Sequence, residues 1–319
     1  MSADPRRRPL RVGVDMGGTK TEAVAVDDAG RVVARAIVST QRGDAGVVAT
    51  LTGVLDVLGA DTARSAASIG VGIPGQIESG VVRHAVNLGV SGLDLGEALE
   101  AATGVPARVE NDVKAAALGA LALRGSRPGS KPLGADDGFA YLNLGTGVAV
   151  GIVVGGRLWR GAGGVAGEVG HMSVDPSGPE CVCGQRGCIE AYAGGDAIAR
   201  RWGRSGDLPV RDVFDASDAG DREAAELRAG LSRGVAGAVR MLVLTAGVSE
   251  IVVGGGLSAL GDRLLADVSR ELGRVSAESP FLRSLRLGER IELLPEGSPA
   301  AALGASLLWP SPAGESVPV

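Results

Sequence analysis

The 319-residue sequence predicts an α/β protein of two domains that carries a zinc-binding loop. Short apolar runs alternate with helix-type segments along the chain, which is the pattern of an α/β fold. A strand–glycine–threonine–strand unit opens the chain at residues 10–27 and returns at residues 139–154, which suggests a duplicated architecture. All three cysteines lie within residues 181–188. With a hydrophobic content of 45%, a chain of this length is long enough to bury two cores.

The chain begins with a predicted β-meander around a glycine turn. Leu10 to Asp15 is an apolar run, residues 21–27 alternate, and residues 31–38 form a further strand-type run. Between the first two runs lies Gly17-Gly18-Thr19-Lys20. Its glycines let backbone N–H groups approach a phosphate, and its threonine adds a donor. Because many hairpins contain two glycines, an ordinary turn remains the alternative at this point.

The next elements lead to an Asn-Asp pair. Apolar positions predict a helix over residues 44–58, a buried strand over 67–73 and a helix over 95–103. A short strand at residues 107–109 then delivers Asn111 and Asp112 to the start of a strong helix former. Such strand ends are where open α/β sheets place ligand groups. Asp112 is therefore either a catalytic group or the cap of this helix, and both readings stay open.

The second half repeats the theme of the first. Two strand-type runs within residues 139–154 flank Gly145-Thr146-Gly147, and the duplication suggests that nucleotide phosphates bind between the halves. A buried helix is expected over residues 222–246, and a strand at residues 251–253 runs into Gly254-Gly255-Gly256. A glycine-rich helix entry offers free N–H groups and a positive dipole end to a nucleotide. A last helix is expected over residues 299–308, returning to the first domain.

The stretch from Glu168 to Glu190 has the composition of a metal loop. It holds Cys181, Cys183 and Cys188 together with His171, one of only two histidines. A tetrahedral zinc site takes four ligands of this kind, and Cys₃His is a standard structural set. The alternative is a disulfide with a spare thiol. The first two cysteines are too close for an easy disulfide, and three is an odd number for a disulfide framework.

Charge and hydropathy exclude several classes of protein. The net charge of −5 provides no broad basic surface for nucleic acid. The patterns GxGxxG and GxxxxGK[ST] are absent, so neither a Rossmann dinucleotide site nor a P-loop is supported. The first ten residues lack the apolar segment of a secretory signal, and no apolar run approaches 18 residues. We therefore expect a cytoplasmic protein without a membrane partner.

Taken in order, the motifs DMGGTK, VENDVKAAALG, LNLGTGVAVGIVVGG, EVGH with CVCGQRGCIE, and VVGGGLS resemble the ROK family of sugar kinases and sugar-responsive repressors. The resemblance covers about residues 10–310 and is most specific at the cysteine loop. It implies a two-domain actin-like ATPase fold of the ribonuclease H-like type, hinged about a sugar cleft. The first domain would comprise residues 1–118 with 298–319. The second would comprise residues 119–297 with the zinc loop and the surface of a homodimer.

The resemblance also implies roles for individual residues. Asp112 matches the general base of the family, which would accept a proton from the sugar 6-hydroxyl during phosphoryl transfer. The sugar-binding positions are Asn87, Asn111, Asp112, Glu168, His171 and Glu190. The ATP-binding positions are Asp15, Gly17, Gly18, Thr19, Lys20, Gly145, Thr146, Gly147, Gly254, Gly255 and Gly256, with Mg²⁺ accompanying ATP. The zinc ligands are His171, Cys181, Cys183 and Cys188, and the second ring nitrogen of His171 would face the sugar.

An ATP-dependent hexose kinase is thus the expected function, with glucose or N-acetylglucosamine as substrate. Mannose, fructose, N-acetylmannosamine and 2-amino sugars stay open, and the intact Gly254–Gly256 motif favours ATP over polyphosphate. The alternative is a sugar-sensing regulator. Regulators of the family carry a DNA-binding module before the kinase-like body, whereas about ten residues precede the first strand here.

Two departures from the family pattern lie beside the predicted site. Val86 precedes Asn87 where many relatives have a proline, and this segment would line the sugar side of the site. Lys114 replaces a more usual small or amide residue, and we interpret it as a solvated helix residue, with a ligand-facing role as the alternative. Residues from Pro310 onward have the composition of a disordered tail.

Overall fold

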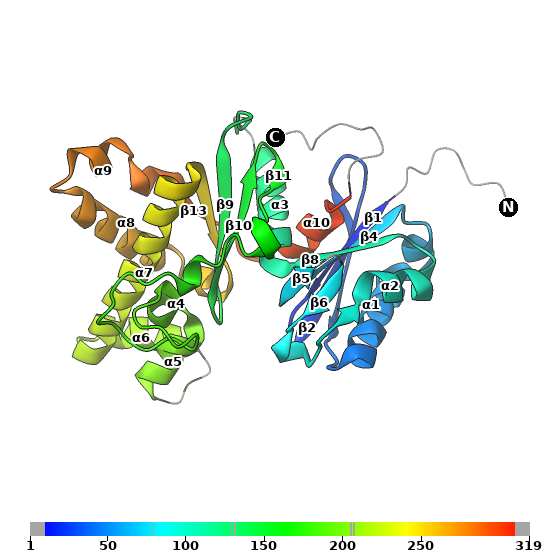
Figure 1. The fold of residues 1–319 in the computed structure, drawn as a ribbon, viewed down its shortest axis with the longest axis horizontal. Helices are drawn as coiled ribbons and strands as arrows, with labels where there is room; N and C mark the ends of the chain where they lie inside the picture. Colours follow the sequence, from blue (N-terminus) through cyan, green and yellow to red (C-terminus); the bar gives the residue numbers. More distant parts are fainter. Residues whose placement is uncertain are drawn as a thin grey trace. The chain divides into compact units, whose positions relative to one another are not determined.

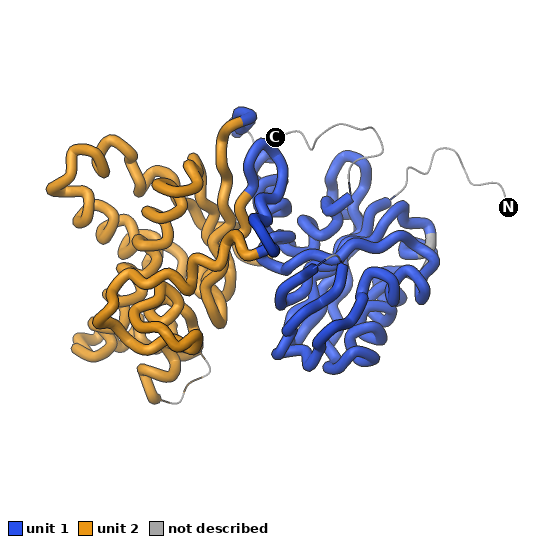
Figure 2. The backbone as a smooth tube through the Cα atoms, viewed as in Figure 1, with its two compact units in different colours: residues 1–135, 153–164, 299–319 blue, residues 136–152, 165–298 orange. Residues whose placement is uncertain are grey.

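The computed structural model describes residues 10–309 apart from Ser79, Pro128, Lys131, Ser205 and Asp207. The expectations for the first nine residues and for the tail from Pro310 lie outside the described residues. The chain forms two compact units: unit 1 is residues 1–135, 153–164 and 299–319, and unit 2 is residues 136–152 and 165–298 (Figure 2). The domain limits expected from the family resemblance stay a prediction.

The first sheet lies in unit 1 and has the strand order β3-β2-β1-β4-β8 (Figure 1). Its strands are β1 (Arg11–Met16), β2 (Lys20–Val26), β3 (Val32–Ser39), β4 (Ser68–Ile73) and β8 (Ala107–Asn111). The first three strands are antiparallel neighbours, which confirms the predicted meander. β4 and β8 run parallel to β1, so the carboxyl ends of β1, β4 and β8 meet at one edge of the sheet.

Helices cover this sheet because their apolar stripes need burial. They are α1 (Asp44–Arg64), α2 (Leu95–Thr103), α3 (Asp112–Gly125) and α10 (Ala300–Ser306). α1 is longer than predicted: it continues past residue 58 across a kink at Gly59, whose φ of 122° ordinary residues rarely adopt. As expected, the last helix returns to the first unit, where α10 packs on α3, β1 and β4.

A small three-stranded sheet extends unit 1 between β4 and α2. It consists of β5 (Gln76–Glu78), β6 (Val81–Arg83) and β7 (Leu93–Asp94), in that order. The 3₁₀ turn η1 (Val86–Leu88) follows β6 and carries Asn87 on the surface, while the side chain of Leu88 is buried beneath it.

The second sheet has the order β11-β10-β9-β12-β13 and thereby repeats the topology of the first (Figure 1). Its strands are β9 (Gly138–Leu144), β10 (Val148–Val154), β11 (Arg157–Leu158), β12 (Val248–Gly254) and β13 (Ile291–Leu293). In both sheets an antiparallel meander is followed by two strands parallel to the first. The repeated strand order confirms the duplication that the two glycine-threonine units predict.

The helices of unit 2 enclose the larger hydrophobic core. They are α4 (Ile189–Ala193), α5 (Gly195–Trp202), α6 (Pro209–Asp218), α7 (Arg222–Ala246), α8 (Asp262–Ser276) and α9 (Pro280–Ser284). Single 3₁₀ turns lie at η3 (Val169–His171), η4 (Gly256–Leu260) and η5 (Leu287–Arg290), and η2 (Ala162–Gly164) belongs to unit 1. α7 has the predicted bounds, whereas the glycine-rich entry after β12 is a 3₁₀ turn rather than an α-helix. None of the helices in the described ranges is both long and apolar enough to span a membrane.

Candidate active site

The Asn-Asp pair lies at the carboxyl edge of the first sheet, where β8 ends and α3 begins. Asn111 is the N-cap of α3, since its Oδ1 accepts hydrogen bonds from the backbone N–H groups of Val113 and Lys114 at 3.0 and 3.1 Å. Its Nδ2 donates to the carbonyl oxygen of Gly75 at 3.2 Å. The capping role that the sequence left open for Asp112 therefore belongs to Asn111. Asp112 is the first helical residue and stays partly exposed.

The first glycine turn lies beside this pair. Register pairs Asp15 of β1 with Gly72 of β4, one residue before the β4 position that pairs with Asn111. The backbone N–H of Gly17 donates to the carbonyl oxygen of Lys20 at 3.0 Å, which closes the turn. A Cβ atom added to Gly18 would lie 3.8 Å from the Cβ atom of Asn87. The predicted phosphate turn and one predicted sugar contact are therefore neighbours within unit 1.

Asp15 has an unusual electrostatic environment. Burial raises the pKa of Asp15 to about 7, and the charges of Asp112 and Glu22 add to the rise while Lys20 opposes it. Two candidate carboxylates thus lie close enough to repel each other. Carboxylate oxygens are the ligands that Mg²⁺ prefers in proteins, and a cation would relieve this repulsion. The donor chemistry around Asp15 therefore fits a divalent cation that accompanies a phosphate.

Lys114 corrects a prediction made from the sequence. The sequence predicts a solvated helix residue, but the relative exposure of Lys114 is only 7%, and its Nζ donates to the carbonyl oxygen of Gly164. The helix around it consists mainly of alanine, leucine and glycine and has no polar face. α3 is covered on several sides, so even its lysine is buried. A single lysine in an otherwise small and apolar helix is the sequence signal that could have indicated burial.

Residues 160–164 belong to unit 1 and are held to the rest of that unit by further side chains, which the sequence does not single out. Gln76 Nε2 donates to the carbonyl oxygen of Gly163 at 3.2 Å. Arg160 Nε donates to Glu110 Oε2 at 2.6 Å, and the Glu110 side chain is buried. Hydrogen bonds to charged groups are stronger than neutral ones. Side chains of β5, β8 and α3 thus fix this segment close to the candidate base.

In unit 2 the second glycine turn joins β9 to β10. The carbonyl oxygens of Gly145 and Thr146 accept hydrogen bonds from the backbone N–H groups of Gly195 and Asp196, at the start of α5, at 2.9 and 3.1 Å. Among the described residues, none accepts a hydrogen bond from the backbone N–H of Thr146 or Gly147. Free N–H groups in a glycine turn suit an anion such as a phosphate.

Glu190 lies directly against this turn. Its Oε2 accepts a hydrogen bond from the backbone N–H of Val148 at 2.9 Å. A Cβ atom at Gly147 would collide with the same carboxylate oxygen, so glycine is required at this position for space. A predicted sugar contact, Glu190, therefore packs directly on the predicted second phosphate turn.

The third glycine segment adjoins the second turn. β9 and β12 are parallel neighbours, and Gly254 pairs with Asn143 at the ends of the two strands. Gly255 has a φ of 84°, and a Cβ atom there would lie 2.5 Å from the carbonyl oxygen of Leu144. The fold thereby brings Gly145–Gly147 and Gly254–Gly256 to one sheet edge, the usual position of ligands in α/β sheets.

The four predicted zinc ligands converge. The ligand atoms of His171, Cys181, Cys183 and Cys188 all lie within 4.8 Å of one another. His171 Nδ1 lies 3.8 Å from Cys181 Sγ, and the Sγ atoms of Cys183 and Cys188 are 3.7 Å apart. Two thiolates on a tetrahedral zinc ion at about 2.3 Å each are separated by about 3.8 Å. The donor set and its spacing therefore fit zinc. Because Nδ1 faces the thiols, Nε2 of the ring points elsewhere.

Glu168 immediately precedes the 3₁₀ turn η3 that carries His171. Its carbonyl oxygen accepts a hydrogen bond from the backbone N–H of His171 at 3.2 Å. Its side chain is exposed. The predicted residues thus form one group in each unit. Unit 1 holds Asp15, Gly17, Gly18, Thr19, Lys20, Asn87, Asn111 and Asp112, and unit 2 holds Gly145, Thr146, Gly147, Glu168, His171, Glu190, Gly254, Gly255, Gly256 and the cysteines.

Comparison of the sequence and of the structure with known proteins points to one family. The sequence profile of the ROK family matches residues 11–311. A glucokinase of Halalkalibacterium halodurans is 33% identical, covering 93% of this chain and 94% of the relative. An N-acetylmannosamine kinase of Yersinia pseudotuberculosis is 30% identical over 76% of this chain and 82% of its own length. The crystal structure of a ROK family glucokinase from Streptomyces griseus in complex with glucose and AMPPNP has a TM-score of 0.71. It is 29% identical, and the match covers 94% of this chain and 98% of that one.

Proposed function

The chain belongs to the ROK family, and we propose that it is an ATP-dependent sugar kinase acting on the 6-hydroxyl of glucose or N-acetylglucosamine. The similarity to a glucokinase along 93% of the chain is the observation that carries this proposal. The two sheets have the same topology, and this supports the proposal. In each sheet a glycine turn joins the first two strands, β1 to β2 and β9 to β10.

Asp112 is the proposed general base. Phosphoryl transfer asks the protein mainly to position the attacking hydroxyl, to accept its proton and to neutralise phosphate charge. Asn111 is the N-cap of α3, and Asp112 follows it as the first helical residue, with Oδ1 accepting a hydrogen bond from the backbone N–H of Val113 at 2.9 Å. The N-terminus of a helix favours negative charge, so its first turn is a suitable place for a carboxylate. An ionised carboxylate is the form that accepts a proton.

The glycine turns are the proposed ATP site. Gly17, Gly18 and Thr19, with Asp15 and Lys20, would serve from unit 1, and residues 145–147 and 254–256 from unit 2. The free N–H groups of Thr146 and Gly147 support this assignment. Mg²⁺, when bound with ATP, neutralises phosphate charge, and Asp15 is the residue proposed to hold it through water.

Sugar recognition is assigned to the polar residues around the two strand edges. Asn87, Asn111, Glu168, His171 and Glu190 supply both donors and acceptors, as the hydroxyl groups of a neutral sugar require. The Nδ1 atom of His171 faces the cysteines, so its Nε2 is left for a sugar hydroxyl. We propose that zinc on this cluster stiffens the loop and thereby orients His171.

A homodimer formed through unit 2 is also proposed. Its support is the exposure of apolar side chains on the zinc loop, namely Met172, Val174 and Val182. Exposed apolar groups of this kind mark protein interfaces. Multi-angle light scattering of the purified chain tests this assignment, and a monomer mass would remove it.

The kinase proposal is tested by ADP release with ATP and Mg²⁺ against glucose, N-acetylglucosamine, mannose, N-acetylmannosamine, glucosamine and fructose. The matched variant is Asp112→Asn, because the amide oxygen keeps the hydrogen bond that Asp112 Oδ1 accepts from Val113 N–H at 2.9 Å. The amide cannot accept a proton, so turnover should fall by about 10²- to 10⁴-fold while sugar binding persists.

The outcomes separate the alternatives. Preference for glucose or N-acetylglucosamine supports the proposal as stated. Preference for N-acetylmannosamine would instead match the relative that is 30% identical over 76% of the chain. Substantial turnover by Asp112→Asn would overturn the base assignment. Sugar binding without any turnover would indicate a sensor.

A further inference from the structure

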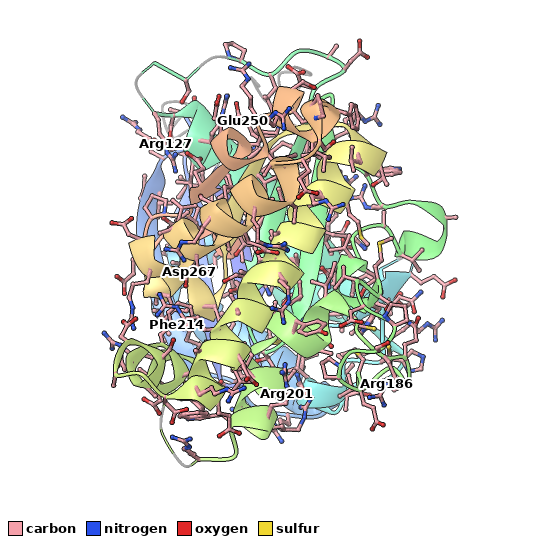
Figure 3. The ribbon with its side chains drawn as sticks, turned by 90° about the vertical axis from the view of Figure 1, so that its left-hand side faces the viewer. Arg127, Arg186, Arg201, Phe214, Glu250 and Asp267 are labelled. Atoms are coloured by element: carbon pink, nitrogen blue, oxygen red, sulfur yellow. The ribbon has the colours of Figure 1, made fainter. Side chains whose placement is uncertain are left out.

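A cavity lies on unit 2, and none of the residues assigned above lines it. It has a volume of about 750 Å³ and is bounded by the segment from Asp175 to Arg186, by α4 and α5, and by α7. Four arginines line it, Arg186, Arg201, Arg222 and Arg233, against the carboxylates of Asp175 and Glu226. Figure 3 shows Arg186 and Arg201 on the lower part of this unit. We call this cavity the arginine pocket.

Tyr192 forms the rigid floor of the arginine pocket. Its side chain is buried, and its hydroxyl donates to Asp175 Oδ2 at 2.7 Å. Glycines of α7 bring the helix against the ring: a Cβ atom at Gly230 would lie 3.2 Å from Tyr192 Cδ1, and one at Gly234 would lie 3.0 Å from Tyr192 Cβ. Close packing against α7 and the hydrogen bond to Asp175 together hold the Tyr192 side chain in place.

Two of the arginines approach this ring, and the nearby carboxylates of Asp175 and Glu271 partly offset the charge of Arg233. The guanidinium carbons of Arg201 and Arg233 each lie 5.8 Å from the centre of the Tyr192 ring. Arg186 and Arg222 form ion pairs with acidic residues, but neither Arg201 nor Arg233 has one with any carboxylate in the described part of the chain. Burial and the positive charge of Arg233 both lower the pKa of Arg201. An anion between the two side chains would remove this repulsion.

The chemistry of the lining selects among anions. Arginine binds phosphate oxygens through pairs of parallel N–H bonds, which favours phosphate over a simple halide. The carboxylates of Asp175 and Glu226 would repel a long polyanion but accept hydrogen bonds from hydroxyl groups. The volume exceeds what one phosphate ion fills. We propose that the arginine pocket is a second ligand site, which binds a phosphate group carried either as free phosphate or as the monoester of a small polyol.

The position of the pocket links it to the candidate active site through α4. This five-residue helix carries both Glu190, whose carboxylate holds the Gly145–Gly147 turn, and Tyr192, which forms the floor of the pocket. Because Tyr192 and Glu190 belong to the same short helix, a ligand bound against Tyr192 would also restrict the position of Glu190. This link rests on the proposed function, whereas binding in the pocket does not.

Isothermal titration calorimetry with inorganic phosphate and with glucose 6-phosphate, at constant ionic strength, tests the site directly. AMPPNP and glucose are kept at saturating concentration, so that the proposed catalytic site is not available to either probe. The test variant is Arg201→Gln with Arg233→Gln. The control is Arg200→Gln, which removes one positive charge from α5, the helix of Arg201, at an exposed position outside the pocket.

The wild type and the Arg200→Gln variant should bind at least one probe with equal affinity, and the double variant should bind at least tenfold more weakly. Tighter binding of glucose 6-phosphate than of phosphate identifies a monoester as the ligand, and equal binding identifies the free ion. Absence of binding to wild type, or unchanged affinity in the double variant, would overturn the proposal. If circular dichroism shows that the double variant is unfolded, Arg233→Gln alone, on the exposed face of α7, carries the same comparison.

The functional link has its own readout. With the probe present, the KM for sugar should change in wild type and in Arg200→Gln but not in the double variant. A chain that binds phosphate in the arginine pocket yet phosphorylates no sugar would refute the proposed function while leaving the pocket assignment standing.

Discussion

Replacing Gly119 by alanine should destabilise unit 1 and slow turnover together, because this glycine is where α3 touches α10. A Cβ atom at Gly119 would lie 2.7 Å from the backbone nitrogen of Gly304 and 2.8 Å from the carbonyl carbon of Ala300, and closer still to the oxygen of that carbonyl. Atoms in ordinary contact lie at least 3.4 Å apart, so the two helices must separate by roughly 1 Å. Overpacking of this kind costs about 1–3 kcal/mol or more.

The same displacement reaches the candidate base. α3 begins at Asp112, two turns before Gly119, so a shift of the helix moves that carboxylate. A misplacement of about 1 Å at a reacting group lowers the rate by on the order of 10²-fold. We therefore expect Gly119→Ala to lower the urea midpoint of unfolding and to reduce kcat with the sugar identified by the panel.

Gly125→Ala is the matched control for this variant. Gly125 lies in the same helix, is exposed, and has no heavy atom within 4 Å of an added Cβ. Alanine there should be neutral or should stabilise by about 0.5–1 kcal/mol, since alanine is the better helix former. Urea unfolding and kcat are measured for both variants and for wild type. Equal stability of Gly119→Ala and Gly125→Ala would refute the inferred packing of α3 on α10.

Two further substitutions test the proposed zinc site and the buried carboxylate of Asp15. Cys183→Ser should lower the zinc content, measured by atomic emission, together with the melting temperature, and an unchanged metal-to-protein ratio would remove the zinc assignment. Asp15→Asn should stabilise the protein increasingly as pH rises from 4 to 8. The pKa of Asp15 in the folded protein is raised to about 7, whereas in the unfolded chain this carboxyl ionises at lower pH. The wild type therefore loses folding stability as pH rises through this range, and the asparagine variant does not. The gain in the free energy of unfolding at pH 8 should reach at most ~4 kcal/mol, and a difference between variant and wild type that does not vary with pH would contradict this reasoning.

Much of the fold could be predicted because its signals are local. The alternating and apolar runs that form β1, β2 and β9 predict strands by their period, and the stripe from Val47 to Leu58 predicts most of α1. The family follows from motifs that are continuous in sequence. The end of α1 was missed because the chain continues as a helix across Gly59, a residue that usually favours a break.

Within the candidate site, prediction was limited where a role depends on neighbours from elsewhere in the chain. Asn111 and Asp112 are adjacent, and only the hydrogen bonds of α3 show that Asn111 is the cap. Lys114 was wrongly placed on a solvated face because its burial comes from packing that no local period records. The repulsion between Asp15 and Asp112 likewise arises from sheet pairing.

The sequence by itself determined the α/β class, the duplicated strand–glycine units, the family and the four residues of the Cys₃His cluster. These features depend on residue type and on spacing over short stretches of sequence, which do not change with the tertiary contacts of the chain. Tertiary structure alone decided which nitrogen of His171 faces the cysteines. It also decided that α10 packs directly on Gly119 and that the side chains of Arg201 and Arg233 both lie near the Tyr192 ring. Such features join segments far apart in sequence, and their geometry follows from close packing of the whole unit.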